Sequence, residues 1–159
     1  MLRPSDYCLI LGILGASSLW AGIFSSPLQA QPFFIGGYGP GVAFSVLDAD
    51  GNMKEPKLLA KQSHPSFFCP PPKLPVLYVV SETMRNDSTH PATLVAYRWN
   101  SDAESGGMAP ELRQFSHQKI DGDIPCHVIL DQTGKVAIVS NYTSGSVVAF
   151  TIGDDGAIG

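Results

Sequence analysis

The chain has 159 residues, enough for one domain with a hydrophobic core, and carries a net charge of −4. Apolar residues make up 44% and charged residues 15%, with 16 glycines and 13 prolines, a composition that indicates a turn-rich β protein and excludes a disordered chain. Because the chain is acidic and has no cluster of Lys or Arg, we expect no nucleic-acid partner.

Residues 1–30 have the order of a secretory signal peptide. A basic start precedes an apolar run from about Cys8 to Phe24, and a short polar segment then leads to Ala30. Asp6 and Leu28 depart from the pattern, and a run of this length is at the short edge of what spans a bilayer, so a retained anchor stays open as an alternative. We predict cleavage, export to the periplasm or the extracellular space, and only transient contact with the membrane through the leader.

Removal of the leader would leave two cysteines, Cys69 and Cys126. Export permits a disulfide, but each cysteine adjoins a proline in a β context and nothing in the sequence places the two side by side. We therefore favour two buried free thiols. The absence of any C-x-x-C pair argues against a zinc or thioredoxin-like site, and we expect no metal and no cofactor.

The mature chain, residues 31–159, contains one four-residue motif three times, which we call the repeated phrase. The copies are Gly41–Phe44, Leu94–Tyr97 and Val147–Phe150, and their aromatic residues lie 53 positions apart in both intervals. Each copy runs into an acidic or Gly-rich turn, the usual signal of a β-hairpin. The turn Asp48–Asn52 could suggest calcium, but it lacks the remaining ligands of a calcium loop, so we interpret it as a hairpin turn.

Shorter strands recur on either side of this phrase. One type is Phe34–Tyr38, Tyr78–Glu82 and Ile138–Tyr142, an earlier type is His64–Phe68 and Pro125–Leu130, and residues 57–60 supply a fourth. Four short strands in a unit of about 50 residues are typical of a β-propeller blade. No long helical periodicity occurs, and residues 84–92 and 101–110 look like loops. The predicted fold is all-β, a β-propeller of four-stranded blades.

The length sets the number of blades. Residues 31–159 suffice for about two and a half blades, whereas propellers close with about four to eight. We therefore expect an incomplete propeller, most simply a truncated one, whose end blades expose apolar faces. Such faces predict aggregation or self-association.

Two segments resemble the lactonase family, which comprises seven-bladed propellers related to bacterial 6-phosphogluconolactonase and fungal carboxy-muconate lactonizing enzyme. The first is Asp123–Lys135 with its continuation through Val139–Tyr142 to Gly145–Val147. The second, one blade upstream, is His64–Phe68 followed by Leu77–Glu82. The match covers nearly all of the mature chain, but only about the first third of the family's length.

The resemblance implies hydrolysis of a small-molecule lactone, ideally 6-phosphogluconolactone. In the lactonizing relatives a histidine of the matching strand belongs to the site, together with Arg and Glu from later blades, so His127 is the expected catalytic residue. Glu82 and Asn141 end equivalent strands and are expected to bind substrate. Arg85 is a further candidate for binding an anionic group.

Other interpretations stay open. His127 could be a hydrogen-bonded structural residue, Glu82 could pair with Arg85, and Asn141 could belong to a local turn. His64, His90 and His117 adjoin proline or polar residues and are interpreted as solvated loop positions. Because later blades would have to complete the site, the alternative function is a non-catalytic exported binding module or an inactive fragment.

Overall fold

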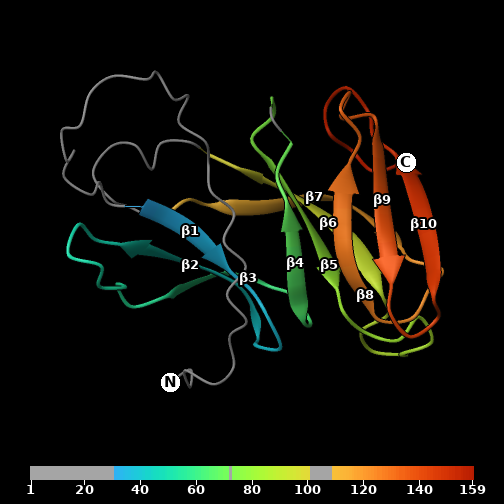
Figure 1. Ribbon diagram of the computed structural model, residues 1–159, viewed down its shortest axis with the longest axis horizontal. Helices are drawn as coiled ribbons and strands as arrows, with labels where there is room; N and C mark the ends of the chain where they lie inside the picture. Colours follow the sequence, from blue (N-terminus) through green and yellow to red (C-terminus); the bar gives the residue numbers. More distant parts are fainter. Residues whose placement is uncertain (1–30, 72, 101–108) are drawn as a thin grey trace, which may run out of the picture.

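The computed structural model describes residues 31–71, 73–100 and 109–159. These residues form ten strands in three antiparallel sheets, with no helix among them, and the sheets follow one another along the chain (Figure 1). None of the described residues forms a helix with the length and apolar character that a bilayer span requires. The predicted leader and most of the expected loop 101–110 lie outside the described residues. The expected all-β propeller fold is confirmed for the part that is described.

The first sheet contains β1 (Gln31–Ile35), β2 (Gly41–Leu47) and β3 (Lys57–Lys61), in that order. The second has the order β4 (Pro65–Cys69), β5 (Val76–Ser81), β6 (Thr93–Trp99) and β7 (Leu112–Lys119). The third contains β8 (Pro125–Leu130), β9 (Val136–Asn141) and β10 (Ser146–Thr151). Each sheet is therefore a meander in which consecutive strands pair.

The repeated phrase occupies the same place in all three sheets, on β2, β6 and β10. Ala43, Ala96 and Ala149 pair with the preceding strand at Ile35, Tyr78 and Ile138, respectively. When the three sheets are aligned on this register, the second sheet is the one that contains all four strands of a blade among the described residues. The third sheet begins its fourth strand with the bridge between Ile152 and Ile158, and the described part of the first sheet has no counterpart of β4 and β8.

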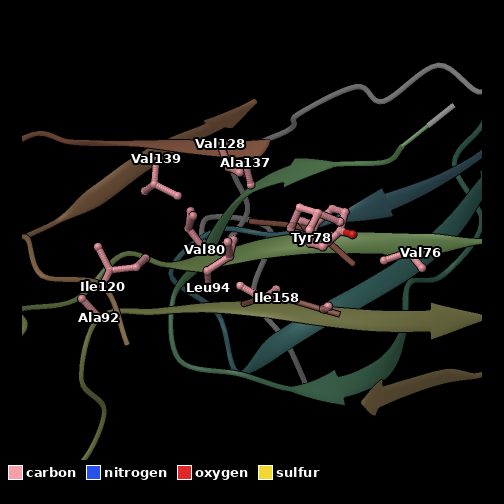
Figure 2. Packing of buried hydrophobic residues seen from close by; sticks show 12 residues of the cluster. Val76, Tyr78, Val80, Ala92, Leu94, Ile120, Val128, Ala137, Val139 and Ile158 are labelled. Carbon is pink, nitrogen blue, oxygen red and sulfur yellow. The ribbon is translucent and has the colours of Figure 1, made fainter. Parts of the chain in front are cut away.

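The strand β5 in the middle sheet is buried on both faces. All six residues of β5 are buried, and the side chains of the five residues before Ser81 alternate between two apolar clusters, because successive residues of a strand point to opposite faces. One cluster lies between the second and third sheets and includes Val76, Tyr78 and Val80 (Figure 2). The other includes Leu77 and Val79 and packs toward the first sheet. The three sheets thus pack face to face, as propeller blades do.

The turn after β2 is a hairpin turn stabilised by its own aspartate. Asp48 Oδ1 accepts hydrogen bonds from the backbone N–H groups of Asp50, at 3.0 Å, and Asn52, at 2.8 Å. The carboxylate therefore satisfies backbone donors, as in an Asx turn. Among the described residues no three His, Cys, Asp or Glu side chains gather in a way that could hold a metal ion.

The two cysteines of the described chain are free, as expected, and both are half-buried rather than buried. Cys126 Sγ lies 3.6 Å from the carbonyl oxygen of Ser140, to which it donates. Burial raises the pKa of the Cys69 thiol, which favours the protonated, unreactive form.

Candidate functional site

The second and third sheets build the same structure twice at one end of their strands. Pro65 pairs with Ser81, and Pro125 pairs with Asn141, so that each inner strand starts beside the end of the next strand. A β-bulge follows each proline. The residues before the prolines, His64 and Ile124, have φ values of 43° and 57°.

Equivalent backbone bonds close both copies. The N–H of Glu82 donates to the carbonyl of His64 at 2.9 Å, and the N–H of Tyr142 donates to that of Ile124 at 2.8 Å. Because the positive φ recurs in both copies, it belongs to the connection between blades rather than to His64 alone. This end of the sheets also carries Asn141 and, directly after the bulge, His127.

His127 lies on β8 and is half-buried. Its ring stands against the ring of Phe67 on β4, with centroids 4.3 Å apart and planes tilted by 55°. Phe67 and His127 occupy equivalent positions after the two bulges, pairing with Val80 and Ser140. No hydrogen bond or ion pair engages the His127 ring within the described part of the chain. Its nitrogens are therefore available to a ligand or a water molecule.

Asn141 is buried, with 3% of its surface exposed, at the end of β9. Its Nδ2 donates to Ser146 Oγ at 3.1 Å, and its Oδ1 has no hydrogen-bond partner among the described residues. The side chain packs on Gly122, where a Cβ atom would overlap it. These contacts are those of a residue that fixes the β9–β10 turn; binding of substrate by Asn141 stays a prediction.

Arg85 faces two carboxylates. Its guanidinium lies 3.0 Å from Asp121 Oδ1 and 3.6 Å from Asp123 Oδ2, and its backbone N–H donates to Asp123 Oδ1. The side chain thus ties the loop after β5 to the link between the second and third sheets, and it does not pair with Glu82. A ligand anion would have to compete with both aspartates for Arg85, so its role as a substrate-binding residue also stays a prediction.

Glu82 is held at the edge of a cleft between the first and second sheets. Tyr38 donates its hydroxyl hydrogen to Glu82 Oε1 at 2.7 Å, and the Tyr38 ring meets the His64 ring edge-on at a centroid distance of 5.2 Å. The cleft has a volume of about 600 Å³ and is lined by Tyr38, Gly39, Pro40, Lys61, Gln62, Ser63, His64 and His90.

His64 lies in the link between β3 and β4, outside the strands as expected, but it is half-buried and lines the cleft. The backbone at His64 is left-handed, with a φ of 43°, and no Gly or Asn in the sequence predicts such a turn at this position. His90 is exposed in a loop as expected, and His117 is exposed but lies on β7 rather than in a loop.

Hydrogen bonds fix the wall of this cleft. Gln62 Nε2 donates to Ser81 Oγ at 2.9 Å, and Tyr97 donates its hydroxyl hydrogen to Gln62 Oε1 at 2.9 Å. Burial raises the pKa of Tyr97 to about 12, so its hydroxyl remains a donor at neutral pH. Gln62 therefore ties the link that follows β3 to β5 and β6 of the second sheet.

Comparison with known proteins gives the family. Residues 33–159 match the family described as lactonase, 7-bladed beta-propeller. The chain belongs to the lactonase family. This membership confirms the resemblance inferred from the repeated motifs.

Individual lactonase relatives agree. The chain is 32% identical to a 6-phosphogluconolactonase of Bacillus subtilis over 106 residues, which are 67% of this chain and 27% of the relative. It is 30% identical to a 6-phosphogluconolactonase of Formosa agariphila over 122 residues, 75% of this chain and 32% of the relative. Among solved structures, the periplasmic gluconolactonase PpgL of Pseudomonas aeruginosa matches with a TM-score of 0.69 and 27% identity, over 82% of this chain and 37% of that chain. The chain thus spans about a third of the length of these lactonases.

Proposed function

We propose that the chain supplies the first blades of a hydrolase that opens the ring of a sugar-acid lactone. The family match over residues 33–159 carries this proposal, because it includes the strand on which His127 lies. The names of the relatives, 6-phosphogluconolactonase and gluconolactonase, give the substrate class. Arg and Glu residues from later blades would complete the site.

The proposed role of His127 follows from its surroundings. A ring nitrogen without a protein partner can accept a proton from water as the water oxygen forms a bond to the lactone carbonyl carbon. The carbonyl oxygen then carries the negative charge, which hydrogen-bond donors must stabilise. As the ring C–O bond breaks, the imidazolium returns the proton to the leaving oxygen. The Phe67 ring restricts the orientation of the imidazole on one side.

Export is part of the proposal. The leader-like order of residues 1–30 supports it, and the Pseudomonas aeruginosa neighbour is described as periplasmic. Outside the inner membrane, an unphosphorylated lactone such as gluconolactone is a more accessible substrate than a phosphorylated cytosolic metabolite. Fractionation of cells that make the chain, followed by N-terminal sequencing of the exported form, tests cleavage near Ala30.

Lactone hydrolysis, measured on a protein that joins this chain to the later blades, tests the catalytic role of His127. We expect His127→Ala to lower kcat about 10²-fold or more, because the loss of a general base typically removes a factor of this size. His117→Ala, a change of an exposed histidine on β7, is the matched control and should leave the rate unchanged. Equal rates for the wild type and His127→Ala would refute the role of His127. Absence of hydrolysis by the wild type would favour a non-catalytic binding module.

A further inference from the structure

The cleft between the first and second sheets differs in charge from the rest of the chain. Acidic residues outnumber basic ones by 14 to 10 overall, yet the residues that line the cleft include Lys61, His64 and His90 and no carboxylate. Two basic side chains come from the segment around β3 and the third from the loop after β5. Three separate positions thus place possible donors around a single volume of about 600 Å³.

The imidazole of His64 is oriented by a backbone carbonyl. His64 Nδ1 lies 3.3 Å from the carbonyl oxygen of Glu82, and since a carbonyl only accepts, Nδ1 carries the hydrogen. Nε2 is then an acceptor in the neutral ring and a second donor in the protonated ring, with the Nδ1 contact unchanged. The edge-on contact with Tyr38 further restricts the ring.

The carboxylates near the cleft are already engaged. Glu82 Oε1 accepts the hydroxyl hydrogen of Tyr38, and Asp87 Oδ1 accepts the backbone N–H groups of Thr89 and His90, both at 2.8 Å. These two backbone bonds lower the pKa of Asp87, which keeps the carboxylate charged close to His90 and His64. Both carboxylates are therefore held by their own hydrogen bonds, and neither lines the cleft.

We propose that this cleft binds the oxyanion group, carboxylate or phosphate, of a sugar acid, with Lys61, His64 and His90 as its donors. The choice of a sugar acid rests on the proposed function, whereas the preference for an oxyanion rests on the lining residues. Charge-assisted hydrogen bonds from ammonium and imidazolium groups to such oxygens are short and strong. The ligand's hydroxyls would meet Tyr38 and Ser63, which line the same cleft.

Equilibrium dialysis of the chain with gluconate, 6-phosphogluconate and neutral sorbitol tests the proposal. At least one acid should bind, and sorbitol should not. Binding of both acids would identify the carboxylate as sufficient, and binding of 6-phosphogluconate alone would identify the phosphate. Failure of both acids to bind, or equal binding of sorbitol, would overturn the proposal.

Matched variants locate the binding. Lys61→Met and His90→Gln should each weaken binding about fivefold, the effect of losing one donor to an oxyanion at the edge of the cleft. Lys57→Met on the same strand and His117→Gln on β7 are controls that should leave the dissociation constant unchanged. Equal constants for all four variants would place the ligand elsewhere and refute the cleft. Dialysis requires no turnover, so the two proposals can fail separately. Acid binding without lactone hydrolysis would reject the proposed function alone. Hydrolysis without binding in the cleft would reject this inference alone.

Discussion

At the scale of single residues, Asn141 and Gly122 illustrate how a short link positions the candidate site. Gly122 precedes β8 and is buried against the amide of Asn141, which in turn donates to Ser146. Ser144 Oγ accepts the N–H of Asp123 at 3.0 Å, so the same turn also fixes the link that leads to His127. The position of His127 thus depends on Gly122, which has no side chain that could take part in a reaction.

Gly122→Ala should lower the free energy of unfolding by about 1–3 kcal/mol, because the added methyl group overlaps the buried Asn141 side chain. Urea denaturation measures this change. Asn141→Ala removes the overlapped group, so the double variant should lose less stability than the sum of the two single variants. Additive losses would show that the two side chains do not interact.

At the scale of elements, the turn between β8 and β9 is built around one carboxylate. Asp131 Oδ2 accepts the hydroxyl hydrogen of Thr133, and Oδ1 accepts the N–H groups of Lys135 at 2.8 Å and Val136 at 2.9 Å. The hydrogen bond from the Thr133 hydroxyl, followed by those from the backbone N–H groups, lowers the pKa of Asp131 to about 2. The ionised form is therefore the one that stabilises the turn.

This turn predicts a pH dependence of stability. Since the pKa is lower in the folded chain than in the unfolded chain, the contribution of Asp131 is present above about pH 4 and is lost as the pH falls toward 2. Asp131→Ala should therefore be less stable than the wild type at pH 6, and the difference should shrink near pH 2. Urea midpoints over this range measure it. Asp50→Ala, which removes a charge from the exposed β2–β3 turn, is the control; a constant difference for Asp131→Ala across the range would contradict the prediction.

The strands could be predicted from sequence because their signal is local. The repeated phrase places Phe44, Tyr97 and Phe150 at equivalent positions of β2, β6 and β10, and alternation alone indicates their pairing. The pairing of loops could not be predicted in this way. Arg85 meets Asp121, 36 residues away, and Tyr38 meets Glu82, 44 residues away, through connections that carry no periodicity.

The cleft escaped sequence analysis for the same reason. Its lining comes from two turns and a loop, and one of the lining residues, His64, has a left-handed backbone that the sequence does not predict. His127, in contrast, lies in a strand with a recognisable motif, so its place on β8 was predicted correctly. The hydrolysis assay tests its action as a base.

At the scale of the whole molecule, the outer face of the third sheet exposes large apolar side chains. Ile129, Ile138 and Val147 are 52%, 36% and 65% exposed. Ile129 pairs with Ile138, which pairs with Ala149 two residues beyond Val147, so these side chains share one face of the sheet. The equivalent face of the second sheet is covered by the third.

We expect the described chain to self-associate through this face, because exposed contiguous apolar surface favours association. Ile129→Lys should weaken self-association about tenfold by removing the burial of one large aliphatic side chain. Sedimentation velocity over a concentration series measures it. Met84→Lys, a change of an exposed apolar residue in the loop after β5, is the control. A wild-type chain that stays monomeric and melts cooperatively would contradict the expectation.

Because β5 is buried on both faces, a substitution in this strand affects more of the structure than a substitution in an outer strand. Each outer sheet touches the middle sheet through one cluster only, so a cavity in β10 weakens a single interface, whereas a cavity in β5 loosens two at once. The middle sheet thus packs against the first sheet, beside the cleft, on one face and against the third sheet, which carries His127, on the other. A loss of packing in β5 is therefore felt at both places. Mutations in β5 should therefore disturb the packing of both the cleft and the strand that carries His127.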